Sequence, residues 1–227
     1  MTVVSIVGAS GRLGRMLVDG LGAGDPQPIA RRSGEDVTTL AARSVAGAGL
    51  VVNAAGVAHI DASGPDDARR LLQGNVELPL ALAGACLSAG IPFVHVSSVK
   101  AVDPDDSPYA RSKRDGDDRL ASDFGSQFAD HNLPLVIVRP IALLIPPFDA
   151  GKLSSLRWIG LLPRWLVPRV PMPVMTASTM LRIVDRIVAD ALAGRCPPGI
   201  EVVAVAPSDR ATLQEVHDTM AADRRGS

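Results

Sequence analysis

Residues 3–14 read Val3-Val4-Ser5-Ile6-Val7-Gly8-Ala9-Ser10-Gly11-Arg12-Leu13-Gly14. The branched apolar residues at the start predict a buried strand, and the residues from position 12 onward predict a helix. Glycines at positions 8, 11 and 14 permit a tight turn, let the backbone approach a pyrophosphate, and let the helix pack closely on the strand. A pyrophosphate there would face the free N–H groups and the positive dipole of the helix N-terminus. This unit predicts a dinucleotide-binding fold.

The rest of the chain repeats this alternation of short apolar runs and helix-length segments, which is typical of parallel strands joined by crossover helices. The other predicted strands lie near Pro28–Ala30 and at Leu50–Asn53, Phe93–Ser97, Leu135–Arg139 and Val202–Ala206. The predicted helices are Arg12–Leu21, Thr38–Val45, Asp66–Ala89, Tyr109–Phe128, Met180–Leu192 and Thr212–Met220. We therefore expect an α/β fold, a Rossmann-type doubly wound parallel sheet with a small C-terminal substrate-side region.

A change in composition suggests how the chain is organised. Residues 1–145 are predicted to form the dinucleotide-binding Rossmann domain, and residues 201–227 a final strand and helix that return to the main fold. Between them, residues 146–200 are predicted to form a substrate-side insertion or lid, because prolines, both tryptophans and interleaved arginines interrupt the strand–helix rhythm at 146–175. A lid or a homodimer contact is favoured for that segment. An interfacial membrane segment carrying Trp158 and Trp165 is the alternative.

The composition is that of an ordinary globular protein, with 47% hydrophobic and 21% charged residues among 227 and a net charge of −1. There is no basic run, so a nucleic-acid partner is not indicated. Two cysteines are too few for a disulfide scaffold, and the four histidines show no metal-ligand spacing, so no metal is expected. The N-terminus has no signal-peptide pattern and no apolar run approaches about 20 residues, so we expect a cytoplasmic protein.

Tyr109 is the only tyrosine in the chain, and it lies four residues before Lys113, one of three lysines. On a helix, this spacing places the phenol and the ammonium on one face, one turn apart. The nearby positive charge is expected to lower the pKa of the phenol and to suit it for proton transfer near neutral pH. The pair therefore predicts an enzyme.

The end of the second predicted strand bears on which dinucleotide binds. An NAD site usually offers an acidic residue there for the ribose hydroxyls. This chain has Arg31 and Arg32 instead, and Arg12 lies within the glycine loop. Guanidinium groups suit a 2′-phosphate, so NADP is favoured over NAD, with solvated surface arginines as the alternative. Asp36 is a further candidate, at the adenine edge.

The next two predicted strands end in small and hydroxyl residues at the edge where open α/β sheets bind ligands. Asn53-Ala54-Ala55-Gly56 leaves room for a cofactor. Val96-Ser97-Ser98 brings a hydroxyl from Ser98 or Ser97 near Tyr109, where it could hydrogen-bond a substrate carbonyl or alcohol.

These motifs resemble, in their order, the extended short-chain dehydrogenase/reductases, and among them the NAD-dependent epimerase/dehydratase proteins that act on nucleotide sugars. The matching segments are Gly8-x-x-Gly11-x-x-Gly14, Asn53-Ala54-Ala55-Gly56, Asn75-Val76, Ser97-Ser98, Pro108-Tyr109-Ala110-Arg111-Ser112-Lys113 and Val138-Arg139-Pro140. Ala55-Gly56-Val57-Ala58-His59 is similar to the family segment that follows the third main strand. The resemblance covers residues 1–145 and continues weakly to about residue 220.

The resemblance implies that hydride passes between the nicotinamide and a secondary alcohol or ketone of a sugar, possibly a nucleotide sugar. Tyr109 would be the general acid/base, Lys113 would hold the nicotinamide ribose, and Ser98, or else Ser97, would position the reacting oxygen. Asn75 would support the active-site helix. The residues expected at the cofactor are Gly8, Ser10, Gly11, Arg12, Leu13, Gly14, Arg31, Arg32, Asp36, Ala54, Ala55, Gly56, Asn75, Val96, Lys113 and Pro140.

Departures from the family pattern concern the substrate side. Ten residues separate Ser98 from Tyr109 where relatives have a longer loop, and Met175-Thr176-Ala177-Ser178 stands in place of an Arg-Ser patch that grips a nucleotide diphosphate. A non-catalytic NAD(P)-binding sensor or scaffold protein is therefore the alternative to an enzyme.

Overall fold

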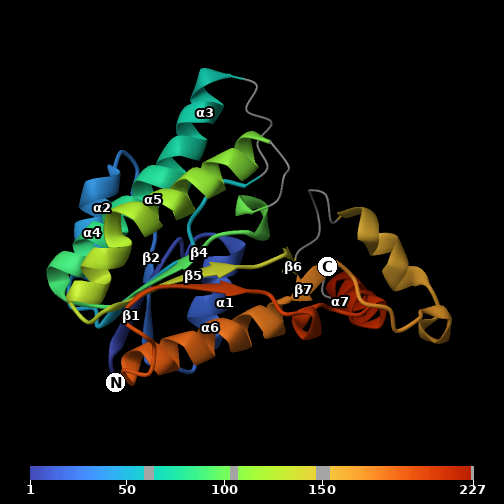
Figure 1. Ribbon diagram of the computed structural model, residues 1–227. Coiled ribbons are helices and arrows are strands. Elements are labelled where there is room, and N and C mark those ends of the chain that lie inside the picture. The colour runs from blue at the N-terminus through green and yellow to red at the C-terminus, as the bar shows by residue number, and fades with distance from the viewer. Residues whose placement is uncertain (59–63, 103–106, 147–153, 226–227) are drawn as a thin grey trace.

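A parallel sheet with helices on both faces forms the body of the protein, as the computed structural model in Figure 1 shows. The structure describes residues 1–58, 64–102, 107–146 and 154–225. The strands of the main sheet lie in the order β2-β1-β3-β4-β5-β8. They are β1 (Val3–Val7), β2 (Asp25–Ile29), β3 (Leu50–Asn53), β4 (Phe93–Val96), β5 (Pro134–Arg139) and β8 (Gly199–Ala204). The predicted doubly wound, Rossmann-type sheet is confirmed.

Two layers of helices cover the sheet. The helices are α1 (Arg12–Gly20), α2 (Val37–Val45), α3 (Pro65–Leu72), α4 (Leu78–Ala89), α5 (Pro108–Asp130), α6 (Ala177–Leu192) and α7 (Leu213–Arg225). Helices α1 and α6 lie on one face, and α2, α4 and α5 lie on the other (Figure 1). Because successive strand residues point to opposite faces, the inner strands β1, β3, β4 and β5 each contribute to both cores. Val4 and Ile6 join the α1/α6 core while Val7 joins the α2/α4/α5 core.

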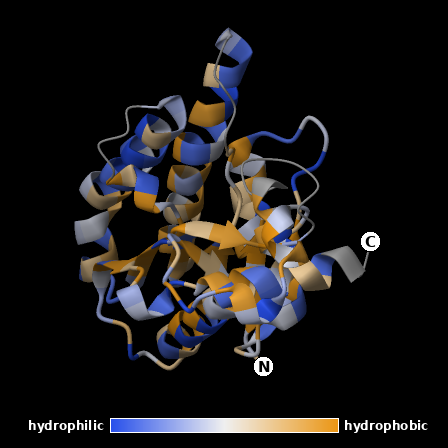
Figure 2. Ribbon diagram, turned by 90° about the vertical axis from the view of Figure 1, so that its right-hand side faces the viewer, coloured by the Kyte–Doolittle hydropathy of each residue, from blue (hydrophilic) through white to orange (hydrophobic). Residues whose placement is uncertain are grey.

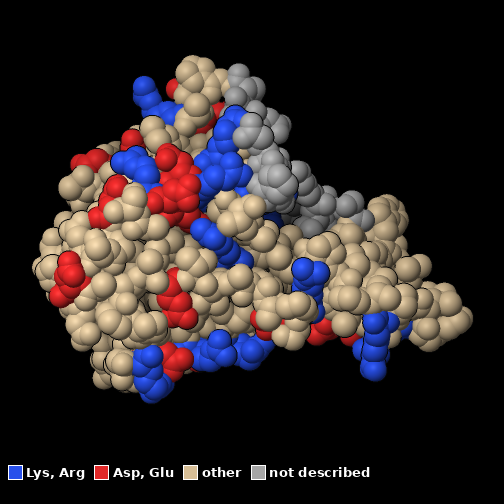
Figure 3. Space-filling model, in the orientation of Figure 1, with Lys and Arg blue, Asp and Glu red and all other residues tan. Residues whose placement is uncertain are grey.

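The hydrophobic residues gather in the sheet and on the inner faces of the helices (Figure 2). On the face seen in Figure 3, basic and acidic side chains are interspersed over the surface. Among the residues that the structure describes, none of the helices combines the length and apolar character that a membrane span needs.

The segment predicted as one helix, Asp66–Ala89, is interrupted by a π-helical turn at Gln73–Glu77, between α3 and α4. Pro79 explains the interruption, since its missing N–H and bulky ring cannot follow an ordinary α-helical turn. The wider turn places Asn75 fully inside the protein, with an exposed fraction of 0%. The prediction of a continuous helix was therefore wrong at this turn, which carries a candidate site residue.

Strand β2 begins three residues before the predicted position near Pro28. It contains Pro26 and Pro28, which the edge of a sheet tolerates because their nitrogens need not donate to a neighbouring strand. Strand β8 likewise begins at Gly199, earlier than the predicted Val202. An edge strand has exposed, alternating residues and can contain prolines, so it lacks the continuous apolar run that marks a buried strand. Its boundaries are therefore not evident from apolar runs.

A second sheet of two short parallel strands was not predicted. Strand β6 (Ala142–Leu144) pairs with β7 (Val174–Thr176), and α7 packs beside them through Val216 and Met220. The segment between the strands contains 3₁₀ turns at Ser154–Leu161 and Arg164–Leu166. Residues 147–153 of the predicted lid lie outside the described part of the chain. The three-part division at residues 145 and 200 stays a prediction.

Candidate active site at the carboxyl edge of the sheet

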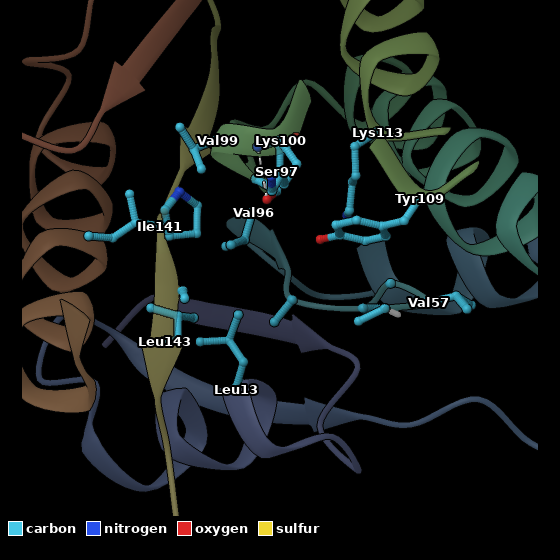
Figure 4. A pocket seen from close by; sticks show the side chains of 17 residues that line it. Leu13, Val57, Val96, Ser97, Val99, Lys100, Tyr109, Lys113, Ile141 and Leu143 are labelled. Atoms are coloured by element: carbon cyan, nitrogen blue, oxygen red, sulfur yellow. Dashed lines mark hydrogen bonds between the residues drawn. The ribbon is translucent and has the colours of Figure 1, made fainter. Parts of the chain in front are cut away.

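A pocket of about 320 Å³ opens where β3, β4 and β5 end. Tyr109 points its hydroxyl into this pocket from α5, and Leu13 and Leu143 lie across from it (Figure 4). The strand order reverses at β1 and β3, which is the place where open α/β sheets bind ligands. The predicted site residues that line the pocket are Leu13, Ala54, Ala55, Gly56, Val96, Ser97, Ser98, Tyr109, Lys113 and Pro140.

The glycine loop fits a dinucleotide because its tight turn has no space for side chains at Gly8 and Gly14. A Cβ on Gly14 would lie 2.1 Å from the carbonyl oxygen of Gly8, and a Cβ on Gly8 would lie 2.6 Å from the backbone nitrogen of Ala55. Gly8 also has a φ of +87°, which L residues rarely adopt. No described side chain caps the N-terminus of α1, and its first turn carries no acidic residue. The N–H groups there are suited to an anion.

The other loop residues predicted at the cofactor, Ser10, Gly11 and Arg12, lie between the end of β1 and the first turn of α1 and are exposed. They do not line the pocket around Tyr109. Gly11 donates its N–H to the carbonyl of Gly8 at 2.9 Å, which closes the turn. Their predicted contacts to the pyrophosphate stay predictions.

The pKa of Tyr109 is raised, contrary to the expectation that Lys113 would lower it. Burial of the phenol is the main cause, a hydrogen bond with Ser98 opposes it, and the charge of Asp117 adds to it. Burial disfavours the phenolate, and the charge that acts on it is the carboxylate of Asp117 rather than the ammonium of Lys113. Without a ligand, the protein therefore holds Tyr109 protonated.

The two serines at the end of β4 have different surroundings. Ser98 is hydrogen-bonded to Tyr109, and its Oγ accepts the N–H of Lys100 at 3.2 Å, so it is fixed at the start of a 3₁₀ turn. Ser97 is buried, with 6% of its surface exposed, and its Oγ has no hydrogen-bond partner among the described residues. The geometry favours Ser98 as the residue that meets a reacting oxygen.

Lys113 lies deep in the pocket wall, with 4% of its surface exposed. Burial lowers its pKa to about 8, and the charge of Asp117 opposes this effect. Gly56 leaves space above it, because a Cβ there would lie 3.0 Å from both the Nζ of Lys113 and the Oδ1 of Asn75. A side chain at position 56 would therefore crowd both of these polar groups.

Asn75 has a structural part in the site. Its Oδ1 accepts the N–H of Val57 at 3.0 Å, and its Nδ2 donates to the carbonyl of Val57 and to the hydroxyl of Ser112, both at 2.9 Å. These bonds tie the loop after β3 to the helix that carries Tyr109. They agree with the predicted role of supporting the active-site helix, while a direct contact of Asn75 with the cofactor stays a prediction.

Arg31, Arg32 and Asp36 lie beyond the end of β2 and are exposed. Asp36 caps α2 by accepting the N–H of Thr39 at 2.8 Å, so the structure gives it a local role besides the predicted one at the adenine. Glu35 is a second acidic residue near this edge, and Arg43 binds its carboxylate at 2.8 Å. That hydrogen bond holds the pKa of Glu35 well below its usual range.

Several residues of the site were not predicted. The pocket is also lined by Val57, Ala58, Val99, Lys100, Ile141, Ala142 and Leu143. Beside it lie Asp117 and Arg139, which form an ion pair at 2.8 Å, and His95, whose Nε2 is 4.0 Å from Asp117. The spacing of Asp117, four residues after Lys113, was a signal that it shares the helix face of the Tyr–Lys pair. His59, from the similar segment after the third strand, lies outside the described residues.

Comparisons with known proteins match this geometry to a family. A family model described as the NAD dependent epimerase/dehydratase family matches residues 4–144. No curated protein sequence matches the chain.

Solved structures share the fold at low sequence identity. A dTDP-4-dehydrorhamnose reductase from Bacillus anthracis in complex with NADP is 14% identical, with a TM-score of 0.65 over 99% of this chain and 81% of its own. A UDP-N-acetylglucosamine 4-epimerase from Bacillus cereus is 16% identical, with a TM-score of 0.67 over 98% of this chain and 84% of its own. MoeE5 in complex with UDP-glucuronic acid and NAD is 21% identical, with a TM-score of 0.67 over 98% and 82%.

Proposed function

The chain belongs to the NAD dependent epimerase/dehydratase family, and from this premise we propose that it is an NAD(P)-dependent oxidoreductase or epimerase acting on a sugar derivative. Tyr109, Lys113 and Ser98 form its proposed catalytic site. The observation that carries the proposal is one pocket that is lined by Ser98 and the small residues after β3 and into which the phenol of Tyr109 points.

The residues present fit a dinucleotide in three places. The glycine loop admits no Cβ at Gly14, the N-terminus of α1 is open to a pyrophosphate, and Gly56 leaves room beside Lys113. The nicotinamide would supply or accept the hydride. Lys113 would hold the ribose next to it, since an ammonium can donate hydrogen bonds to two hydroxyls.

Proton transfer falls to Tyr109. The protein holds its phenol protonated by burial, the state needed to give a proton to an oxygen that gains negative charge. Ser98 is hydrogen-bonded to the same phenol, so its hydroxyl is placed to form a hydrogen bond with the reacting oxygen as well. In the opposite direction, Tyr109 would accept the proton of the substrate alcohol.

The pocket favours this chemistry because it is apolar around the reacting groups. Among the described residues that line it, none is acidic, and Leu13, Val96, Ile141 and Leu143 form much of the wall. Such a wall excludes water and strengthens the interactions of the few polar groups inside.

The substrate class is proposed from the relatives. Solved structures with this fold include enzymes of dTDP- and UDP-linked sugars. We propose a sugar with a secondary alcohol or ketone, carried by a nucleotide or free. The segment Met175-Thr176-Ala177-Ser178, which forms the end of β7 and the start of α6, offers no cation to a diphosphate.

The experiment that tests the function has two parts. Purified protein is first denatured and the released small molecules are identified by mass spectrometry; it is then assayed with NADPH or NADH against a panel of keto and hydroxy sugars, with and without nucleotides. Net oxidation of the cofactor would mark a reductase, and conversion of the sugar with retained cofactor would mark an epimerase. Cofactor binding without conversion of any sugar would favour a sensor. A cellular function that Tyr109→Phe leaves unaffected would favour it as well.

Cofactor selectivity gives a separate prediction. Replacing Arg31 and Arg32 together by alanine should weaken NADPH binding by about 10- to 100-fold while NADH binding changes little, because bonds to a charged phosphate contribute about 1.5–3 kcal/mol. Equilibrium titration of both cofactors measures the effect.

The matched control is Arg195→Ala, an exposed arginine that precedes β8 at the opposite, amino edge of the sheet. Equal weakening of NADPH and NADH binding in the double variant would contradict a 2′-phosphate site at Arg31 and Arg32.

A further inference from the structure

A buried carboxylate lies one helical turn beyond Lys113. Tyr109, Lys113 and Asp117 follow one another at intervals of four residues along α5, so they share one face of the helix. The side chain of Asp117 is completely buried. It does not line the pocket, so it cannot be explained by contact with a ligand there.

A neighbouring strand holds this carboxylate in place. Arg139, at the end of β5, donates its Nε to the Oδ2 of Asp117 at 2.8 Å. His95, in β4, lies near the other oxygen, but its Nε2 is 4.0 Å from the Oδ1 of Asp117, too far for a hydrogen bond. Burial raises the pKa of Asp117, and the neighbouring Ser97 and Arg139 oppose this effect. Since an arginine stays charged, its short contact favours the ionised carboxylate.

The hydrogen bonds of His95 fix which nitrogen faces Asp117. The Oδ1 of Asn53 accepts the N–H of Ala55 at 3.1 Å, which leaves its Nδ2 to donate to the Nδ1 of His95 at 3.1 Å. Burial keeps the pKa of His95 well below its usual value, with the charge of Lys113 adding to the effect, so the ring is neutral. Its proton is therefore on Nε2, which has no hydrogen-bond partner among the described residues.

Arg139 thus supplies a charged donor to Asp117, whereas burial disfavours the charged form of Lys113. An ammonium with 4% of its surface exposed loses its hydration and tends to give up its proton unless an opposite charge is close. Of the described acidic residues, Asp117 is the one whose charge raises the pKa of Lys113.

We propose that Asp117 is a positioning residue of the active site: its buried carboxylate keeps the ammonium of Lys113 charged, and Arg139 keeps that carboxylate in place. The inference rests on the proposed function for its meaning in catalysis, but the charge of Lys113 can be measured without a substrate. A neutral lysine would hold the cofactor ribose less firmly.

The sign of the pH dependence follows from the pKa of Lys113, which burial lowers to about 8. The lysine is charged below that pH and becomes neutral above it. The groups facing it are Asp117 and Tyr109 on its own helix, His95 of β4 and Asn75 of the π-helical turn, with Arg139 of β5 behind Asp117. Of these, Asp117 carries the negative charge at neutral pH.

The test is an NMR titration of the ligand-free protein that contains isotope-labelled lysine. The chain has three lysines, so the signal of Lys113 can be assigned by its loss in Lys113→Met. In Asp117→Asn, the pKa of Lys113 should fall by about 1 to 3 pH units, the range for losing an adjacent opposite charge. In Asp117→Glu, the pKa of Lys113 should lie close to its wild-type value. In enzyme that turns over, the alkaline limb of kcat should move to lower pH by the same amount.

Two further variants separate this role from a structural one. Leu120→Ala destabilises the same helix by removing a fully buried side chain and leaves the carboxylate intact, so the pKa of Lys113 should stay at its wild-type value. Asp117→Asn/Arg139→Met removes both charges and should keep the pKa of Lys113 low. This double variant also serves if Asp117→Asn alone does not fold.

Three results would overturn the proposal: a wild-type pKa of Lys113 in Asp117→Asn, recovery of that pKa in the double variant, or an equal fall in Leu120→Ala. Recovery in the double variant would mean that the unpaired arginine, not the missing carboxylate, acts on Lys113. These titrations need neither cofactor nor substrate. If only the proposed function is wrong, the protein will show no turnover, but the pKa of Lys113 will still change in the variants as predicted.

Discussion

Tyr109→Phe is expected to lower kcat by about 10²- to 10⁴-fold, the contribution typical of a general acid or base, with cofactor affinity largely unchanged. The substitution removes the phenolic oxygen that points into the pocket and leaves the ring in its place. Steady-state kinetics with the substrate found in the panel, together with NADPH titration, measure the two effects separately.

The serines provide the controls for this result. Ser98→Ala should also lower kcat, because Ser98 is hydrogen-bonded to the phenol, whereas Ser97→Ala should leave kcat much closer to the wild-type value. If Tyr109→Phe retained wild-type turnover, Tyr109 would not be the proton donor and the assignment of the site would fail.

Gly14→Ala is expected to weaken NADPH binding by at least about tenfold and to destabilise the protein by about 1–3 kcal/mol, the usual cost of overpacking. A Cβ at this position would lie 2.1 Å from the carbonyl oxygen of Gly8 and 2.9 Å from the Cα of Ala9. These are backbone atoms of the turn itself, so the turn must shift and with it the N–H groups at the start of α1. Titration of NADPH and denaturant unfolding measure both effects.

Gly64→Ala is the matched control, since a Cβ there would meet nothing within 4 Å and the residue has ordinary extended backbone angles. It should bind NADPH as the wild type does. Undiminished binding of NADPH by folded Gly14→Ala would show that the first strand–helix turn does not hold the cofactor.

The sequence allowed the centre of the fold to be predicted because local and global signals agree there. The strand at Leu50–Asn53 has the predicted bounds, since all four of its residues are buried. Strand β6, by contrast, has three residues and depends on pairing with β7, some thirty positions later. Such a short strand has no periodicity of its own, so whether it forms depends on pairing between residues that are distant in the sequence.

The candidate site shows the same division. Tyr109, Lys113 and Ser98 share a pocket as their spacing predicted. The pKa of Tyr109 was wrongly predicted, because the desolvation that raises it depends on residues far apart in the chain. The contact of Asp117 with Arg139 joins residues 22 positions apart and could not be read from spacing along one helix.

A crystal structure of the protein with bound NADPH would test the central claim most directly. We predict the pyrophosphate at the first turn of α1, the nicotinamide in the pocket that Ser98 and Tyr109 line, and the ammonium of Lys113 hydrogen-bonded to the ribose hydroxyls. A nicotinamide bound away from Tyr109, or no NADPH bound at saturating concentration, would contradict the account.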